Sequence, residues 1–226
     1  MGLKESGLRG SLRSVSTGVS AIPDDALAQF VANDDPQSSG SISTIPDQLA
    51  DFDLDGNAEI VTDELNGNDV YRLTRSDFVQ NTSLSDKNQP NAYFMVVKVE
   101  TSDSNDVIVD GAGSTDANTH QLFKNDDPDE YSLQGDIQGG SVSNWDIITA
   151  IFDTDNSVLR KNGTEVASGA IADEILSGIT VGASRDGENG STMDFAEFIP
   201  TSSRPSSQTI DQQEQRLSDQ YDLPLD

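Results

Sequence analysis

Three aspartates in the segment DFDLDGNAEI alternate ahead of a glycine and form the clearest metal-ligating pattern in the sequence. Asp51, Asp53 and Asp55 match the first, third and fifth positions of an EF-hand calcium loop, and Gly56 matches the sixth. Carboxylate oxygens at this spacing would coordinate Ca²⁺. The match ends there, because the twelfth position is Thr62 instead of a bidentate glutamate and neither flank is typical of a helix.

The simpler interpretation of this stretch is a turn at Asp55–Gly56–Asn57 that leads into a strand, AEIVT. Calcium stays the one candidate cofactor, as an ion at the rim of the fold that uses some of the three aspartates to stiffen a loop. A second acidic loop, with Asp106, Asp110 and Asp116, is another place for such an ion, although its spacing is not diagnostic.

Catalytic side chains are few. His120 is the sole histidine, no G-x-S-x-G motif occurs, and we interpret His120 as a solvated residue at a strand edge. A retaining glycosidase needs two carboxylates about 5 Å apart on one face. Asp194 and Glu197 are three residues apart, which on a regular strand places them on opposite faces. We therefore expect no enzymatic activity.

The charge of the chain restricts its partners. Asp and Glu number 40 against 13 Lys and Arg, and the formal net charge is −27. Such a surface disfavours nucleic acid and anionic membrane. The acidic residues are scattered singly between apolar runs such as AYFMVVKVE, which favours a folded protein in molar salt, where the Debye length is about 3 Å, over a disordered chain. We expect a halophilic source, and the absence of cysteine excludes disulfides.

Strands are the elements that must position these residues, because the visible hydrophobic period is two. Asn162–Gly163 between two strand-like runs predicts a hairpin with a type I′ turn. Pro205 and Ser206 begin a helix over about 206–221, whose apolar face carries Ile210, Leu217 and Tyr221. Strands are expected at Leu27–Val31, Ala58–Thr62, Asp69–Leu73, Asp77–Asn81, Ala92–Glu100, Val107–Asp110, Gln121–Phe123, Tyr131–Gln134, Trp145–Asp153, Val158–Lys161, Glu165–Ser168, Ile179–Gly182 and Met193–Ile199.

The run NWDIITAIFDTDNSVLRKNGTEVASG, followed by LSGITVGASRDGENGSTMDFAEFIP and a terminal helix ending DQYDL, resembles the laminin-G-like, concanavalin A-like jelly roll of many virion, tail and cell-surface proteins. The resemblance covers residues from about 24 to 223. It implies an all-β fold of two curved antiparallel sheets with a helix across one end, and Trp145 as a core or rim aromatic. Lectins, glycosidases and structural modules all use this fold, so it does not fix a function. The expected interior comprises Phe94, Val96, Ile148, Ala150, Phe152, Phe195 and Phe198.

Residues 1–22 differ from the rest of the chain, because Lys4, Arg9 and Arg13 are opposed only by Glu5 among small polar residues. We predict an extended basic arm that docks on an acidic neighbouring subunit, ahead of a jelly-roll domain over 23–226. The arm has no apolar segment of the kind found in signal peptides. It is similar to the attachment leaders of phage and haloarchaeal virus structural proteins.

Together these features give one hypothesis of function. The chain would be a structural protein on the surface of a virus of a halophilic archaeon, as a capsid turret, spike, decoration or tail fibre component. It would be homo-oligomeric, contact other virion proteins through the arm, and present its jelly roll to a host-surface glycan or glycoprotein. The alternatives are an accessory module of a carbohydrate-active enzyme and a cell-envelope adhesion domain.

Overall fold

The protein is an all-β sandwich closed by one C-terminal helix, as expected from the sequence. The computed structural model describes residues 22–37, 39–49, 51–100, 106–111, 120–126 and 128–226. The predicted basic arm, with Lys4, Arg9 and Arg13, lies outside the described residues, as does Asp116. All pairs of strands in the described part are antiparallel, which permits the short connections between them.

Two layers of strands face each other. The helix layer consists, in hydrogen-bonded order, of β4 (Asn68–Leu73), β15 (Met193–Thr201), β6 (Asn91–Val99), β11 (Asp146–Phe152), β12 (Ser157–Lys161) and β13 (Thr164–Gly169), with β1 (Phe30–Val31) beside β15. The second layer consists, also in hydrogen-bonded order, of β10 (Ile137–Ser141), β9 (Glu130–Leu133), β8 (Gln121–Lys124), β7 (Asp106–Asp110), β14 (Ile179–Val181) and β5 (Val79–Asn81).

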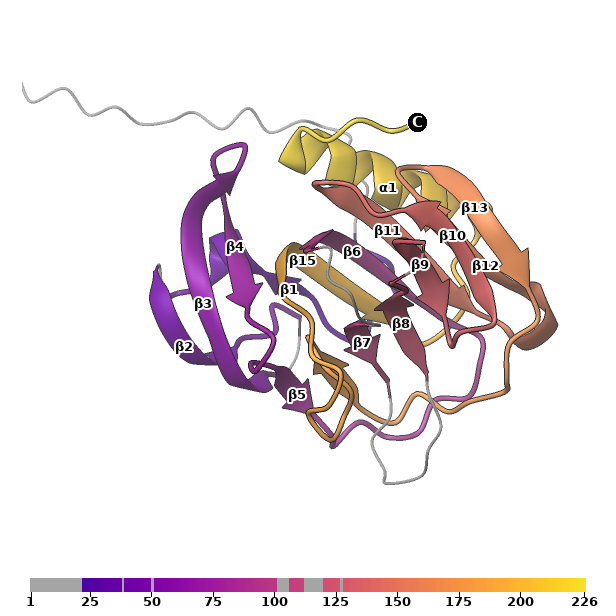
Figure 1. Cartoon of the computed structure of the whole chain (residues 1–226), viewed down its shortest axis with the longest axis horizontal. Helices are drawn as coiled ribbons and strands as arrows, with labels where there is room; N and C mark the ends of the chain where they lie inside the picture. The colour runs from indigo at the N-terminus through magenta and orange to yellow at the C-terminus, as the bar shows by residue number, and fades with distance from the viewer. Residues whose placement is uncertain (1–21, 38, 50, 101–105, 112–119, 127) are drawn as a thin grey trace, which may run out of the picture.

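The long strand β3 (Leu54–Leu65) joins the two layers, because it pairs with β5 of the second layer and with β4 of the helix layer. The sandwich is therefore one continuous sheet folded on itself, where two sheets were expected (Figure 1). Strand β2 (Gly40–Ile45) pairs with β3 at its free side. Two short 3₁₀ turns, η1 (Ala32–Asp34) and η2 (Thr154–Asn156), complete the connections.

Strand β3 begins at Leu54, so the turn predicted at Asp55–Gly56–Asn57 is wrong. The glycine is required for a different reason. A Cβ atom at Gly56 would lie 2.0 Å from the carbonyl oxygen of Phe78, where the chain that enters β5 lies close beside β3. Close approach of two backbones, in place of a reversal of direction, explains the Asp-Gly-Asn sequence.

The main core lies between the layers and contains five of the seven interior residues expected on β6, β11 and β15, together with Val109, Leu122 and Leu133 from the second layer. Phe94 and Val96 are buried as expected but face the other way. They belong to a smaller hydrophobic cluster beneath the helix, here called the helix cluster, which also contains Ile147 and Ile151. The five expected residues of the main core are Ile148, Ala150, Phe152, Phe195 and Phe198.

Helix α1 (Ser207–Tyr221) lies across β11 and β6 on the outside of the helix layer (Figure 1). The Ser206 side chain accepts a hydrogen bond from the Thr209 backbone and caps the first turn. Ile210, Leu217 and Tyr221 pack into the helix cluster, which confirms the predicted boundaries and apolar face. The hairpin between β12 and β13 is also confirmed, with Asn162 and Gly163 both at positive φ.

Candidate functional site

A row of polar side chains crosses the second layer at right angles to its strands. Backbone pairing sets its members opposite one another on successive strands, from Asp55 on β3 to Gln134, which directly follows β9. Its central pairs are Thr180 of β14 with Gln80 of β5 and with Asp110 of β7. The polar row comprises Asp55, Gln80, Thr180, Asp110, Gln121 and Gln134.

The polar row lies on the outer face of the second layer. Side chains alternate between the faces of a strand, and the chain neighbours of the row belong to the main core. Thr180, for example, stands between Ile179 and Val181, and Gln121 precedes Leu122. The outer face of the helix layer is covered by α1, so the two outer faces of the sandwich differ in kind.

Several polar atoms of this face are buried without a partner. The Thr180 side chain is 0% exposed and its Oγ1 makes no hydrogen bond. Gln80 Oε1 and both amide atoms of Gln134 are buried and unpartnered as well. Native structures satisfy nearly all buried polar groups with protein, water or ligand. Four such atoms, on Thr180, Gln80 and Gln134, lie along the polar row, which makes it the candidate site for hydrogen bonds from water or a ligand.

The fold fixes other members of the row in place. Asp110, 3% exposed, accepts hydrogen bonds at Oδ2 from Gln121 Nε2 and from the backbone N–H of Arg185, both at 3.0 Å. At the other end Thr44 Oγ1 donates to Asp55 Oδ1 at 3.0 Å. Amide, hydroxyl and carboxylate groups therefore alternate along the row with preset orientations, which suits a ligand rich in both donors and acceptors.

An aromatic ring lies next to the polar row. Phe123, two residues after Gln121 on β8, alternates with core residues and so faces outward, where it is half-buried. It stands opposite Ser132 of β9, whose buried Oγ is a further unpartnered atom. A partly exposed ring beside hydrogen-bonding groups offers a ligand one apolar surface along with the polar contacts.

The structure places the predicted calcium ligands in different surroundings. Asp51, Asp53 and Asp55 are exposed, Asp53 Oδ1 accepts the backbone N–H of Asp47, and Asp55 belongs to the polar row. No group of three or more His, Cys, Asp or Glu suited to a metal ion occurs among the described residues. A calcium ion at these aspartates stays a prediction. In the second acidic loop, Asp106 forms an ion pair with Arg75 at 2.7 Å, at the opposite end of β7 from Asp110.

His120 is 0% exposed, so the predicted solvated position at a strand edge is wrong. Its ring stacks on Phe152, and its two nitrogens contact Tyr93 Oη at 2.8 Å and Asn91 Oδ1. Since Asn91 Oδ1 can only accept, Nε2 carries the proton and Nδ1 accepts from Tyr93. Burial lowers the pKa of His120 to about 3. The histidine is a neutral part of the core, inside the sandwich.

Asp194 and Glu197 face the same side of β15, against the expectation from regular alternation. A β-bulge between Phe195 and Glu197 inserts one residue and returns Glu197 to the outer face of the helix layer. Both carboxylates are nevertheless engaged. Asp194 binds Arg72 through both oxygens, at 2.7 and 2.8 Å, and Lys98 lies 3.6 Å from it.

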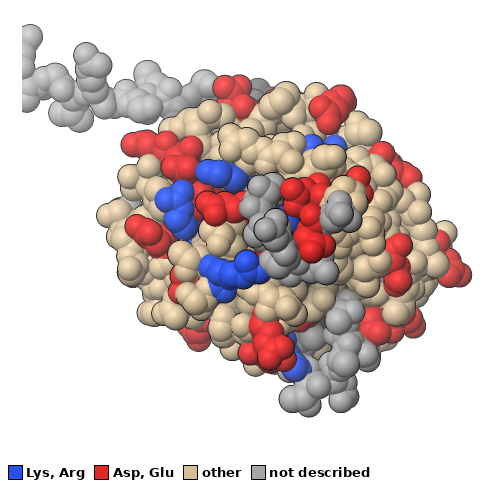
Figure 2. Space-filling model, in the orientation of Figure 1, with Lys and Arg blue, Asp and Glu red and all other residues tan. Residues whose placement is uncertain are grey.

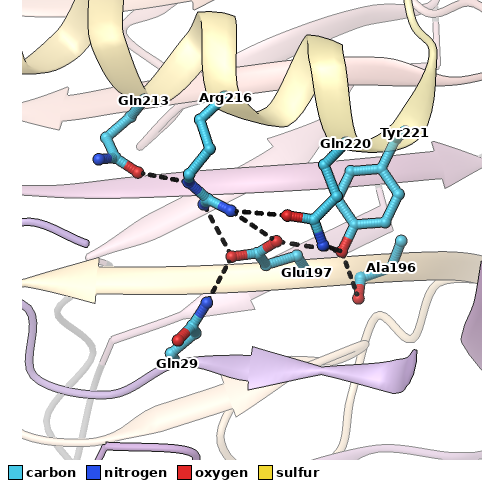
Figure 3. A network of polar contacts seen from close by, with 7 residues as sticks. All are labelled: Gln29, Ala196, Glu197, Gln213, Arg216, Gln220 and Tyr221. Carbon is cyan, nitrogen blue, oxygen red and sulfur yellow. Dashed lines mark hydrogen bonds and ion pairs between the residues drawn. The ribbon is translucent and has the colours of Figure 1, made fainter. Parts of the chain in front are cut away.

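Glu197 is 0% exposed and lies beneath α1 (Figure 3). Its Oε1 accepts from Gln29 Nε2 at 2.8 Å and from Arg216 Nη2 at 2.7 Å. Its Oε2 accepts from Tyr221 Oη at 3.0 Å and from Arg216 Nη1 at 3.2 Å. Burial and the Glu197 charge raise the pKa of the Tyr221 hydroxyl far above its usual value. These contacts fasten the helix to the sheet and occupy the carboxylate that a glycosidase mechanism would need.

Trp145 is half-buried and packs against the helix cluster, with Lys98 Nζ 5.8 Å from its ring centre, in keeping with its expected place at the rim. Acidic side chains are spread over the face visible in Figure 2, and the fewer basic ones lie close to acidic neighbours. No helix in the described part of the chain is long and apolar enough to cross a membrane.

Sequence reasoning missed the polar row because its members come from six segments far apart in the chain. A usable signal was present, since each of Gln80, Thr180, Gln121 and Gln134 directly adjoins an apolar strand residue. Polar residues at the outward positions of strands are ordinary in solvated sheets, however, and only pairing shows that these stand opposite one another.

No family model matches the chain, and no curated protein matches it by sequence. Solved structures do share its fold. The receptor-binding domain of a botulinum neurotoxin of C/D mosaic serotype is 12% identical with a TM-score of 0.57, over 86% of this chain and 52% of that one. A family GH54 α-L-arabinofuranosidase is 15% identical with a TM-score of 0.64, over 85% of this chain and 58% of that one.

A sialidase of Trypanosoma rangeli, in complex with 2,3-difluorosialic acid, is 12% identical with a TM-score of 0.55, over 89% of this chain and 34% of that one. The chain thus matches only part of each of these proteins. At such identities the likeness shows a shared β-sandwich of the jelly-roll type, and the activities of the larger proteins do not transfer with it.

Proposed function

We propose that the protein is a non-catalytic binding module that attaches to a host-surface glycan through the polar row. The polar row is the observation that carries the proposal. Its buried and unpartnered atoms on Thr180, Gln80 and Gln134 need hydrogen-bonding partners, and a sugar supplies hydroxyl groups that both donate and accept. Phe123 adds an apolar surface for the carbon-bound hydrogens of the ring.

The structural neighbours support this class of ligand. One is a receptor-binding domain, one a sialidase seen with a sialic acid derivative, and one an arabinofuranosidase. Binding without turnover is favoured because the two carboxylates that share a face, Asp194 and Glu197, are both held in ion pairs. A general acid or nucleophile has to be available to the substrate, and these are not.

We further propose that the module is displayed on the particle of a virus that infects a halophile, as a turret, spike, decoration or tail fibre component. Support comes from the net charge of −27, which suits molar salt, and from the basic segment that carries Lys4, Arg9 and Arg13. Several copies on one particle would raise a weak single-site affinity by avidity.

Binding of a panel of polysaccharides and host envelopes in about 3 M KCl tests the proposed function. The matched variants are Gln134→Ala on the polar row and Gln215→Ala on the exposed side of α1, each of which removes one glutamine amide. We expect Gln134→Ala to weaken binding about tenfold and Gln215→Ala to leave it unchanged. Release of reducing sugar would contradict a non-catalytic role, and absence of the protein from purified particles in mass spectrometry would end the virion proposal.

A further inference from the structure

Arg185 differs from the other basic side chains of the protein. Of the ten Lys and Arg residues that the structure describes, eight form ion pairs with Asp or Glu. Arg185 and Lys87 form none. Most described basic side chains of this acidic protein are thus in direct contact with a carboxylate, and Arg185 is an exception.

The backbone places Arg185 at the polar row. After β14 the chain turns back over the second layer, where Gly182 donates to the Ile108 carbonyl at 2.9 Å. The backbone N–H of Arg185 then donates to Asp110 Oδ2 at 3.0 Å. Asp110 is a member of the row and faces outward, so Arg185 lies on the same outer face as the row.

The guanidinium of Arg185 has a donor without an acceptor. Its Nη1 is buried and makes no hydrogen bond. The nearby carboxylates serve other donors, because Asp186 Oδ1 accepts from Ser184 Oγ at 2.7 Å, while Asp110 Oδ2 accepts from Gln121 and from the Arg185 backbone. The residue as a whole is only half-buried, which leaves it open to an acceptor supplied from outside.

We propose that Arg185 binds the carboxylate of an acidic sugar whose hydroxyl groups lie on the polar row, and so sets the specificity of the module for uronic-acid-type saccharides. The inference rests on the proposed function and adds the class of sugar. The planar fork of a guanidinium matches a carboxylate in geometry and charge.

The net charge of the protein does not prevent this contact. In molar salt the Debye length is about 3 Å, so repulsion from distant acidic residues is screened. A direct, partly buried pair between Arg185 and a ligand carboxylate is screened much less than distant charges, because little salt or water lies between the two groups. Under the conditions for which this surface is suited, the local arrangement of charges therefore decides which sugar is preferred.

The test compares oligogalacturonate with its methyl ester, in which each carboxylate is replaced by a neutral ester that carries one additional methyl group. Titration calorimetry in about 3 M KCl would measure both ligands against the full chain and against Arg185→Gln, Arg185→Lys and Lys87→Gln. Lys87→Gln is the matched control, since it removes the other basic side chain without an ion pair, and Lys87 pairs with Leu176, outside the polar row. Circular dichroism of each variant verifies the fold.

We expect the wild type to bind the free acid about tenfold more tightly than the ester. Arg185→Gln should remove this preference, Arg185→Lys should keep part of it, and Lys87→Gln should keep all of it. Equal binding of acid and ester, with sensitivity to Gln134→Ala, would overturn the role of Arg185 and leave the proposed function standing. Failure of both ligands and of every neutral saccharide would overturn the two proposals together.

Discussion

Removing the charge of Arg216 should weaken the attachment of α1 to the sheet. In Arg216→Met, Glu197 loses its hydrogen bonds to Nη2 at 2.7 Å and to Nη1 at 3.2 Å but keeps those from Gln29 and Tyr221. The carboxylate stays 0% exposed and loses its only cation among the described residues. Breaking a buried pair in this way costs about 3–5 kcal/mol.

Urea unfolding in about 3 M KCl would measure this cost. Trp145 is the single tryptophan and packs against the helix cluster, so its fluorescence reports on this part of the fold. Arg204→Met is the matched control, because the pair of Arg204 with Asp153 is partly exposed and should contribute less than about 1 kcal/mol.

The double variant Arg216→Met/Glu197→Gln measures the cost of the stranded charge. Replacing the stranded carboxylate with a neutral amide should recover part of the loss, since the amide still accepts from Tyr221 and no charge stays buried. The reasoning would be refuted if Arg216→Met lowered the free energy of unfolding by no more than Arg204→Met, or if the second substitution made the first one worse.

Three further predictions concern stability. The folded-state pKa of His120 is about 3, below its unfolded value near 6.5. Its contribution to the free energy of unfolding is therefore complete above pH 6.5 and is lost as the pH falls toward 3. Between pH 6 and 5 the wild type should lose about 1 kcal/mol of stability that His120→Gln does not lose. Gly56→Ala should destabilise the fold by more than 2 kcal/mol, because a Cβ would lie 2.0 Å from a carbonyl oxygen. Gly67→Ala, with open space around it, should cost about 1 kcal/mol, and similar unfolding midpoints for the two variants would count against the close approach of Phe78 to β3. Lowering KCl from about 3 M to 0.1 M extends the Debye length to about 10 Å. Repulsion within a chain of net charge −27 is then less screened, so the midpoint of thermal unfolding should fall. An unchanged midpoint would contradict adaptation to salt.

The elements of the fold were largely predictable from local signals. The Asn162–Gly163 turn, the Ser206 cap and the period-two runs are properties of short segments, and each of the expected strands overlaps an observed one. Strands β2 and β10 were missed, because Gly40–Ile45 and Ile137–Ser141 are rich in Gly, Ser and Gln and show little apolar alternation.

The errors arose where contacts distant in sequence override a local pattern. Gly56 looked like a turn residue, but the constraint on it comes from the Phe78 backbone. Regular alternation would put Asp194 and Glu197 on opposite faces of β15. A β-bulge puts them on one face, and only the pairing of β15 with β6 shows this bulge. His120 looked solvated because a lone polar residue between polar neighbours carries no sign of the Tyr93 and Asn91 side chains that satisfy it.

Thr180→Val provides the most direct test of the polar row as a binding face. The substitution keeps the shape of a side chain that is 0% exposed and removes a hydroxyl without a partner, so the free energy of unfolding should rise or stay unchanged. If the hydroxyl serves a ligand, the same variant should bind the saccharide selected from the panel about tenfold more weakly. Unchanged affinity in a variant of at least wild-type stability would contradict the account.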